Sequence, residues 1–279
     1  MTVIDAHHHL WDLSKREYDW LGDLDPIRRT YTVADLAAVS PATATVLVQT
    51  IPSVEETEEF LATASSTPLI AGVVGWLNLC APDLPDRIAE LREVPGGAQL
   101  IGLRHPAQGE PDPNWLVRQD VVRGITAVAE AGLTYDILIH PQQHDAAIAL
   151  ADAVPGARFV LDHAGKPAIA SSGYEPWAKF LTALAARPNV FCKLSGLVTE
   201  ANWTEWTVDD LRPYADHVLE SFGPERVMFG SDWPVCELAA TYDQVYESAQ
   251  AFTGSLSESE RADVFGGTAT RAYPIPTPV

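Results

Sequence analysis

The chain alternates short apolar runs with longer segments of helical pattern, and this alternation limits its fold more than any other feature. The apolar runs cover residues 3–9, 44–50, 69–77, 99–105, 134–140, 158–163, 189–194 and 226–231. Several are apolar at successive positions, for example Val46-Leu47-Val48, which is typical of a strand buried on both faces in a parallel sheet. The runs therefore predict eight strands of one parallel sheet.

Helical patterns fill the intervals between these runs. Helices are predicted over residues 53–65, 117–131, 145–153, 175–186, 209–222 and 257–264. The first and last begin with capping boxes, Ser53-x-x-Glu56 and Ser257-x-x-Glu260. About eight strand–helix alternations predict a (β/α)8 TIM barrel, and we expect one domain over residues 1–279. A doubly wound open sheet is the alternative, but the Gly-x-Gly-x-x-Gly turn that would favour it follows none of the runs.

Charge and cysteine content limit the partners and the compartment. Acidic residues outnumber basic ones 38 to 18, giving a net charge of −20, so nucleic acid and anionic membrane surfaces are poor partners. The sequence has no apolar run of the roughly 18–20 residues that a membrane span needs, and its first residues lack the features of a secretory signal. Three cysteines without paired spacing favour a reducing cytoplasm over a disulfide scaffold.

The first predicted strand ends in three consecutive histidines, His7, His8 and His9. Side chains alternate between the two faces of a strand, so His7 and His9 share one face and His8 takes the other. Two imidazoles about 6–7 Å apart on one face can share a metal ion or a substrate oxygen. In a TIM barrel the active site lies at the C-terminal ends of the strands, so we interpret this pair as functional.

Further polar residues stand at the ends of later predicted strands. They are Arg104 and His105 after the fourth strand, His140 after the fifth, Asp162 and His163 after the sixth, and Asp232 after the eighth. An arginine in such a place can hold a carboxylate or a polarised carbonyl in its fork of donors. Asp232 follows an apolar run that should be buried, so its carboxylate needs a partner, which the histidines or a metal would supply.

Longer motifs surround these positions. They read Ile4-Asp5-Ala6-His7-His8-His9-Leu10-Trp11, Gly102-Leu103-Arg104-His105, Val160-Leu161-Asp162-His163-Ala164-Gly165-Lys166-Pro167, Cys192-Lys193-Leu194-Ser195-Gly196-Leu197-Val198-Thr199-Glu200 and Met228-Phe229-Gly230-Ser231-Asp232-Trp233-Pro234-Val235-Cys236. Together they resemble the amidohydrolase superfamily, and more closely its sugar-lactonase branch. The resemblance covers nearly the whole chain. It implies a distorted (β/α)8 barrel that hydrolyses the intramolecular ester of a sugar-acid lactone.

The resemblance also implies roles for individual residues. Asp232 is expected to activate water, while His7, His9 and His163 polarise the lactone carbonyl directly or through a bound metal. One divalent ion, expected to be Zn²⁺, could use the same four residues, and His140 matches a histidine of the metal-dependent branches. The chemistry does not require the ion, because a lactone is an activated ester that a carboxylate base and a few donors can open.

The fourth strand argues against a two-metal centre. Many two-metal amidohydrolases have a bridging lysine or glutamate after this strand, where the present chain has Arg104-His105.

Aromatic and polar side chains are expected to bind the sugar. Tryptophan rings can pack against the C–H faces of a sugar ring, and charged or polar side chains can hydrogen-bond its hydroxyls. The residues predicted for substrate binding are Trp20, Trp76, Trp233, Arg104, His105 and Lys193.

Two other functions remain open from the sequence. His140 favours a metal-dependent amidohydrolase or decarboxylase of the same superfamily. A non-catalytic sugar-binding barrel is the second alternative, although a pure binding protein has no evident use for a carboxylate among histidines.

Overall fold

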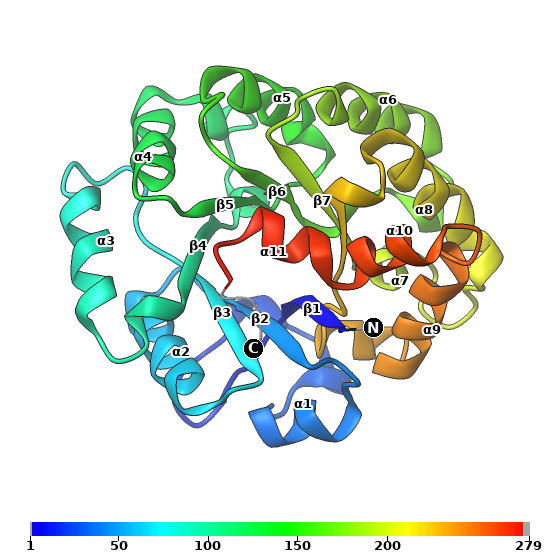
Figure 1. Ribbon diagram of the computed structural model, residues 1–279, viewed down its shortest axis with the longest axis horizontal. Coiled ribbons are helices and arrows are strands. Elements are labelled where there is room, and N and C mark those ends of the chain that lie inside the picture. The colour runs from blue at the N-terminus through cyan, green and yellow to red at the C-terminus, as the bar shows by residue number, and fades with distance from the viewer. Residues whose placement is uncertain (1, 276–279) are drawn as a thin grey trace.

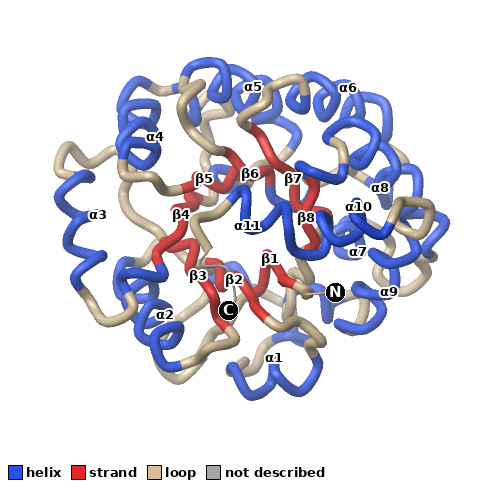
Figure 2. The backbone as a smooth tube through the Cα atoms, in the orientation of Figure 1, coloured by secondary structure: helices blue, strands red, loops and turns tan. Residues whose placement is uncertain are grey.

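The computed structural model describes residues 2–275 and places eight parallel strands side by side in chain order. The strands are β1 (Ile4–His8), β2 (Ala44–Val48), β3 (Ile70–Gly75), β4 (Leu100–His105), β5 (Thr134–Ile137), β6 (Phe159–Leu161), β7 (Val190–Leu194) and β8 (Val227–Phe229), each within the run predicted for it. They form a ring at the centre of the molecule, with helices around its outside (Figures 1 and 2). The predicted barrel is confirmed.

The ring closes through residues that follow β8. A bridge pairs His8 with Trp233, the backbone N–H of Asp232 donates to the carbonyl of His7 at 2.8 Å, and that of His9 donates to the carbonyl of Trp233 at 2.7 Å. The end of β1, which carries the histidines, is thereby joined to the segment that carries Asp232.

Each of the six predicted helices forms. The helices of the described residues are α1 (Val33–Val39), α2 (Val54–Ser66), α3 (Leu84–Glu93), α4 (Gln119–Glu130), α5 (His144–Ala153), α6 (Tyr174–Ala185), α7 (Leu197–Glu200), α8 (Val208–Phe222), α9 (Tyr242–Phe252), α10 (Glu258–Ala262) and α11 (Thr268–Ala272). The patterns do not predict α1, α3, α7, α9 or α11. The starts of α1 and α9 have capping boxes built on Thr32 and Thr241, a signal that the sequence does contain.

Only one of the two hydrogen bonds of the capping box predicted at Ser53 forms, and the carboxylate freed in this way stabilises a loop of the site. The Ser53 hydroxyl accepts from the N–H of Glu56 at 3.1 Å, but the Glu56 carboxylate turns away from Ser53. It accepts instead from the N–H groups of Thr50 and Ile51, at 2.8 and 3.2 Å. Glu56 thus fixes the loop between β2 and α2, which forms one wall of the pocket described below.

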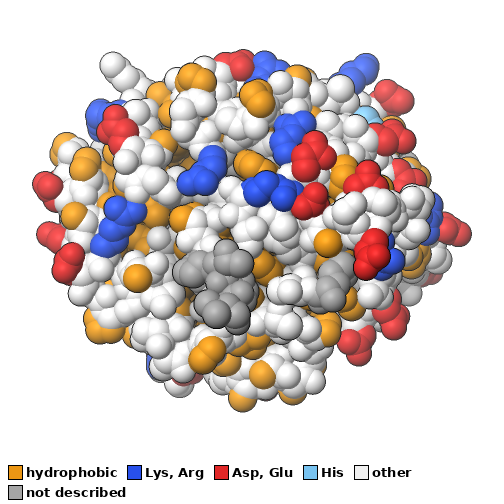
Figure 3. All heavy atoms as spheres, in the orientation of Figure 1, with side chains coloured by type: hydrophobic (Ala, Val, Ile, Leu, Met, Phe, Trp, Pro, Cys, Tyr) orange, Lys and Arg blue, Asp and Glu red, His pale blue; other side chains and the backbone are white. Residues whose placement is uncertain are grey.

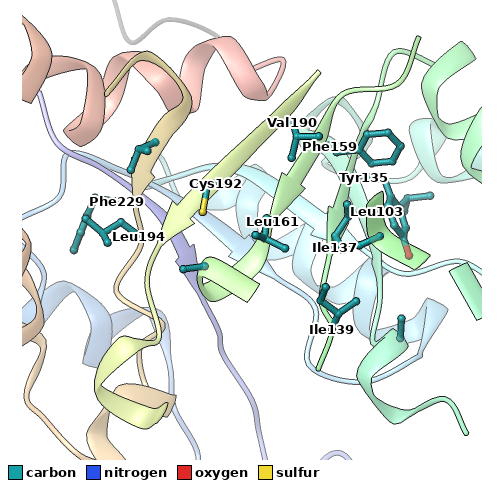
Figure 4. Close-up of a cluster of buried hydrophobic side chains, with 14 of the residues drawn as sticks. Leu103, Tyr135, Ile137, Ile139, Phe159, Leu161, Val190, Cys192, Leu194 and Phe229 are labelled. Atoms are coloured by element: carbon teal, nitrogen blue, oxygen red, sulfur yellow. The ribbon is translucent and has the colours of Figure 1, made fainter. Parts of the chain in front are cut away.

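The core has two layers, one on each side of the strands. The outer layer packs strand side chains such as Leu103, Phe159 and Phe229 against the surrounding helices, and Figure 4 shows part of it. The inner layer fills the barrel with smaller side chains, and Tyr273, which follows α11, belongs to it. In Figure 1 α11 lies across the ring of strands. It sits at their N-terminal end, where the Thr134 hydroxyl at the start of β5 donates to the carbonyl of Ala272.

The exterior is charged and mixed. On the face shown in Figure 3, acidic side chains lie around the rim with basic ones between them. Across residues 2–275, no helix combines the length and the apolar character that crossing a bilayer requires.

Candidate active site

One carboxylate and three imidazoles meet at the C-terminal end of the barrel. His7 and His9 come from the end of β1, His163 follows β6, and Asp232 follows β8. All four residues are buried, none more than 5 % exposed. The Oδ1 atom of Asp232 lies 3.5 Å from His9 Nε2, 3.7 Å from His7 Nε2 and 3.9 Å from His163 Nε2. The structure thus brings together the four residues predicted to be catalytic.

Strand alternation places the histidines of β1 as predicted. The Nε2 atoms of His7 and His9 are 3.1 Å apart, whereas the His8 ring points to the opposite face and contacts the Thr45 hydroxyl at 2.9 Å. The Nδ1 atom of His9 lies 2.8 Å from the carbonyl of Val48, which can only accept. The Nδ1 atom of His9 therefore donates to this carbonyl, and Nε2 is the ring atom that faces the site.

Local backbone geometry aims the other two members of the cluster. His163 and Asp232 both have left-handed backbones, with φ of 52° and 56°, a conformation that costs energy for residues other than glycine. The Ser195 hydroxyl lies 2.9 Å from His163 Nδ1 and fixes the ring. Buried Asp5 accepts from the N–H and hydroxyl of Ser231, at 2.8 and 2.6 Å, and so braces the residue before Asp232.

Burial and neighbouring charges set the protonation states of the cluster. Burial lowers the pKa of His163 to about 4 and that of His7 well below its usual value. Burial alone would raise the pKa of Asp232, but His163, His9 and Lys166 together hold it below its ordinary value. At neutral pH Asp232 is therefore an ionised carboxylate, and His7 and His163 are neutral imidazoles. Such a set can take a proton from water at the carboxylate.

A fully buried charge network supports the cluster from inside the barrel. The Lys193 ammonium lies 2.6 Å from Asp136, 2.9 Å from Asp162 and 3.1 Å from His7 Nδ1. The Arg104 guanidinium lies 3.0 Å from Asp162 and also donates to the carbonyl of Gln49. Lys193, predicted to bind substrate, is fully buried among these partners and is not one of the residues that line the pocket.

A cavity of about 600 Å³ opens above the cluster. Its lining includes His9, His163 and Asp232 at the bottom, Arg104 and Leu138 from the fourth and fifth strand ends, Trp20, Glu17 and Asp19 from the loop after β1, and Lys166, Thr199 and Glu200. Trp20, at 37 % exposed, is the predicted tryptophan that lines the cavity. Lys166 and Glu200 fall within the motifs quoted above but were not predicted as site residues, because their positions depend on the turns after β6 and β7.

Three other residues predicted to bind substrate lie outside this lining. The Trp76 indole donates to His105 Nδ1 at 3.1 Å, and His105 contacts the Glu110 carboxylate at 2.8 Å, so these side chains satisfy one another. Trp233 is buried and donates to the Glu237 carboxylate at 2.8 Å. It supports the site through its backbone contact with β1.

The structure does not bring His140 to the histidine cluster. Strand β5 ends at Ile137, and Pro141 begins a short 3-10 helix in which Gln143 accepts from the His140 N–H. The chain has therefore left the barrel wall before it reaches His140, and Leu138 lines the pocket instead.

The donor set fits a divalent metal ion. Within residues 2–275, one group of potential ligand atoms joins His7, His9 and Asp232, and a second joins His7, Asp162 and His163, with the atoms of each group within 4.8 Å of one another. The Nε2 atom of His9, which faces the site, and the ionised Asp232 are ligands of the kind that Zn²⁺ takes. The bond from His9 Nδ1 to a carbonyl is the usual support for such a histidine.

Comparison with known proteins identifies the family of this chain. A family model described as Amidohydrolase matches residues 4–275. The chain is 40% identical to an L-fucono-1,5-lactonase of Burkholderia multivorans over 99% of its length and 97% of the relative's, and 38% identical to an L-fucono-1,5-lactonase of Burkholderia ambifaria over 99% and 96%. A crystal structure of an amidohydrolase from Burkholderia multivorans with bound zinc covers 99% of this chain and 100% of that one, at 37% identity and a TM-score of 0.94. The protein belongs to the amidohydrolase family.

Proposed function

We propose that the protein hydrolyses a sugar-acid lactone, L-fucono-1,5-lactone or a related aldonolactone, to the free aldonate. The family and the two lactonase relatives identify it as a hydrolase acting on lactones. The observation that carries the proposal is the Asp232 carboxylate, which faces three imidazoles at the bottom of a cavity large enough for a sugar ring.

In the proposed mechanism Asp232 acts as the general base. Its carboxylate takes a proton from water, and the water oxygen forms a bond to the lactone carbonyl carbon. The bond between that carbon and the ring oxygen then breaks, and the proton held by Asp232 passes to the leaving oxygen. The aldonic acid formed in this way loses its carboxyl proton to solvent and becomes the aldonate. Arg104 and His163 both line the cavity, where their N–H groups can stabilise the negative charge that develops on the carbonyl oxygen.

We further propose that His7, His9 and Asp232 hold one Zn²⁺ ion. Such an ion would polarise the lactone carbonyl and lower the pKa of bound water when present. His163, whose Nδ1 contacts Ser195, would remain free to face the substrate.

The experiment is a panel of L-fucono-, D-arabinono-, L-galactono- and L-rhamnono-lactones, assayed by proton release on chelator-treated protein and again after addition of Zn²⁺. We expect ring opening of at least one aldonolactone. Activity that survives chelation places the chemistry on Asp232 and the imidazoles, and activity restored only by Zn²⁺ makes the ion essential. Failure on every aldonolactone, with turnover of an amide or a carboxylated ring, would refute the proposal.

The alternative of a metal-dependent amidohydrolase or decarboxylase rested on His140. That residue lies in neither group of potential metal ligands among residues 2–275, so the structure does not support the argument from His140 for this alternative. We also propose a cytoplasmic location, since Cys80, Cys192 and Cys236 are all free thiols.

A further inference from the structure

Two charged side chains in the cavity form no hydrogen bond or ion pair with any residue between 2 and 275. Lys166 follows the left-handed turn after β6, and Glu200 is the last residue of α7. Both side chains are partly buried and line the cavity. Across residues 2–275, no group lies within hydrogen-bond distance of the Lys166 ammonium or the Glu200 carboxylate, and the two do not form an ion pair.

A charge that loses part of its water usually gains a hydrogen-bond partner in exchange, because lost hydration without replacement costs free energy. Lys193 and Asp162, inside the barrel, follow this rule: Lys193 donates to Asp136 at 2.6 Å, and Asp162 accepts from Arg104 at 3.0 Å. Lys166 and Glu200 depart from it, and they do so while facing a space that a ligand can enter. Their charges also support each other, since Lys166 opposes the rise that burial causes in the pKa of Glu200.

The balance of charge in the cavity limits what that ligand can be. Four carboxylates line it, those of Glu17, Asp19, Glu200 and Asp232, against the two cations of Lys166 and Arg104. Arg104 is already engaged by Asp162 at 3.0 Å. A carboxylated substrate would therefore meet four carboxylates and two cations, one of which is already paired, and like charges repel. A neutral substrate with many hydroxyl groups meets no such penalty.

We propose that Glu200 and Lys166 form the hydroxyl-recognition pair of this pocket and select neutral, polyhydroxylated lactones over unsubstituted or carboxylated ones. Glu200 accepts hydrogen bonds from ring hydroxyls, and Lys166 donates to the hydroxyl oxygens. Bonds of this kind, with one charged partner, are the stronger class of hydrogen bond. A substrate without the hydroxyls leaves both charges unpaired, so the site discriminates against it. This inference rests on the proposed function, whose substrate class it defines.

The test compares Glu200→Gln and Lys166→Met with two surface controls that make the same changes of charge, Glu220→Gln on α8 and Lys179→Met on α6. Both control side chains are exposed. The first readout is the ratio of kcat/KM for L-fucono-1,5-lactone to that for δ-valerolactone, which has no hydroxyls. We expect each pocket variant to lower this ratio at least about tenfold and the controls to leave it unchanged.

The second readout is binding, measured by calorimetry with the 1,5-lactam of L-fuconic acid and with 2-piperidone, the corresponding lactam without hydroxyls. We expect the pocket variants to weaken binding of the hydroxylated lactam at least about tenfold relative to 2-piperidone. An unchanged ratio and unchanged lactam binding in both pocket variants would overturn the inference. Equal losses of kcat/KM on the two lactones, together with equal losses of affinity for the two lactams, would also overturn it, because they would indicate damage to the chemistry or the fold.

The two readouts separate this inference from the proposed function. Tight, Glu200-dependent binding of the hydroxylated lactam by a protein that opens no lactone would refute only the function. Aldonolactone hydrolysis with unchanged selectivity in the variants would refute only the recognition pair.

Discussion

Replacing Asp232 with asparagine removes the proposed base with little change to its surroundings. Asparagine has almost the same shape, keeps one acceptor oxygen for the imidazoles 3.5–3.9 Å away, and loses the negative charge that receives a proton. The position also requires a left-handed backbone, with φ of 56°, and asparagine tolerates that conformation as well as aspartate does. The fold is therefore expected to survive.

The expected loss follows from the role assigned to the carboxylate. General-base catalysis contributes about 10²–10⁴-fold, or about 3–5 kcal/mol in the barrier. We expect Asp232→Asn to lower kcat for an aldonolactone at least about a hundredfold. Because the side chain is not proposed to hold the ground-state substrate, KM should change little.

The assay is proton release under steady-state conditions, with thermal unfolding as the check on the fold. Asp23→Asn, an exposed position in the loop after β1, makes the same change of charge and serves as the control. Partial recovery in excess Zn²⁺ would indicate that Asp232 acts mainly as a metal ligand. Near-normal turnover by a folded, metal-free variant would remove Asp232 from the mechanism.

Three further predictions concern stability and substrate contact. Burial lowers the pKa of His8 to about 3, so the folded protein resists protonation of this residue. The free energy of unfolding should therefore fall by about 3 kcal/mol from this group as the pH drops from 6.5 to 4. Denaturant titrations should show a shallower decline for His8→Gln than for the wild type. Lys193→Met leaves Asp136 and Asp162 without their shared cation, and we expect a loss of about 3–5 kcal/mol in chemical denaturation; a loss below about 1 kcal/mol would contradict the buried network. Trp20→Ala should raise KM for an aldonolactone about 2–10-fold with little change in kcat, and an unchanged KM would exclude stacking of the sugar on this ring.

The fold was predictable because its signal is local and repeated. Each strand is a short apolar run, and the ends of the first, sixth and eighth runs mark where His7, His9, His163 and Asp232 enter the site. The alternation of side chains along β1 correctly separates His7 and His9 from His8, because it depends only on strand geometry. The turn that aims Asp232 leaves no comparable sign in the sequence.

The rest of the site depends on where the chain leaves each strand. His140 was predicted to lie at the end of β5, but the strand ends three residues earlier and Leu138 takes the pocket position. Lys193 was expected to reach substrate hydroxyls, yet its side chain points into the barrel, where two carboxylates bind it. A lysine in a strand gives no sequence signal for which of these environments it enters.

The most direct test of the central proposal is kcat/KM for L-fucono-1,5-lactone, measured by proton release with the spontaneous opening of the lactone subtracted. The proposal predicts a value within the ordinary enzymatic range of about 10⁴–10⁸ M⁻¹s⁻¹ for this lactone or another aldonolactone of the panel. Rates no faster than spontaneous opening for all of them, with turnover of an amide or a carboxylated ring by the same preparation, would contradict it.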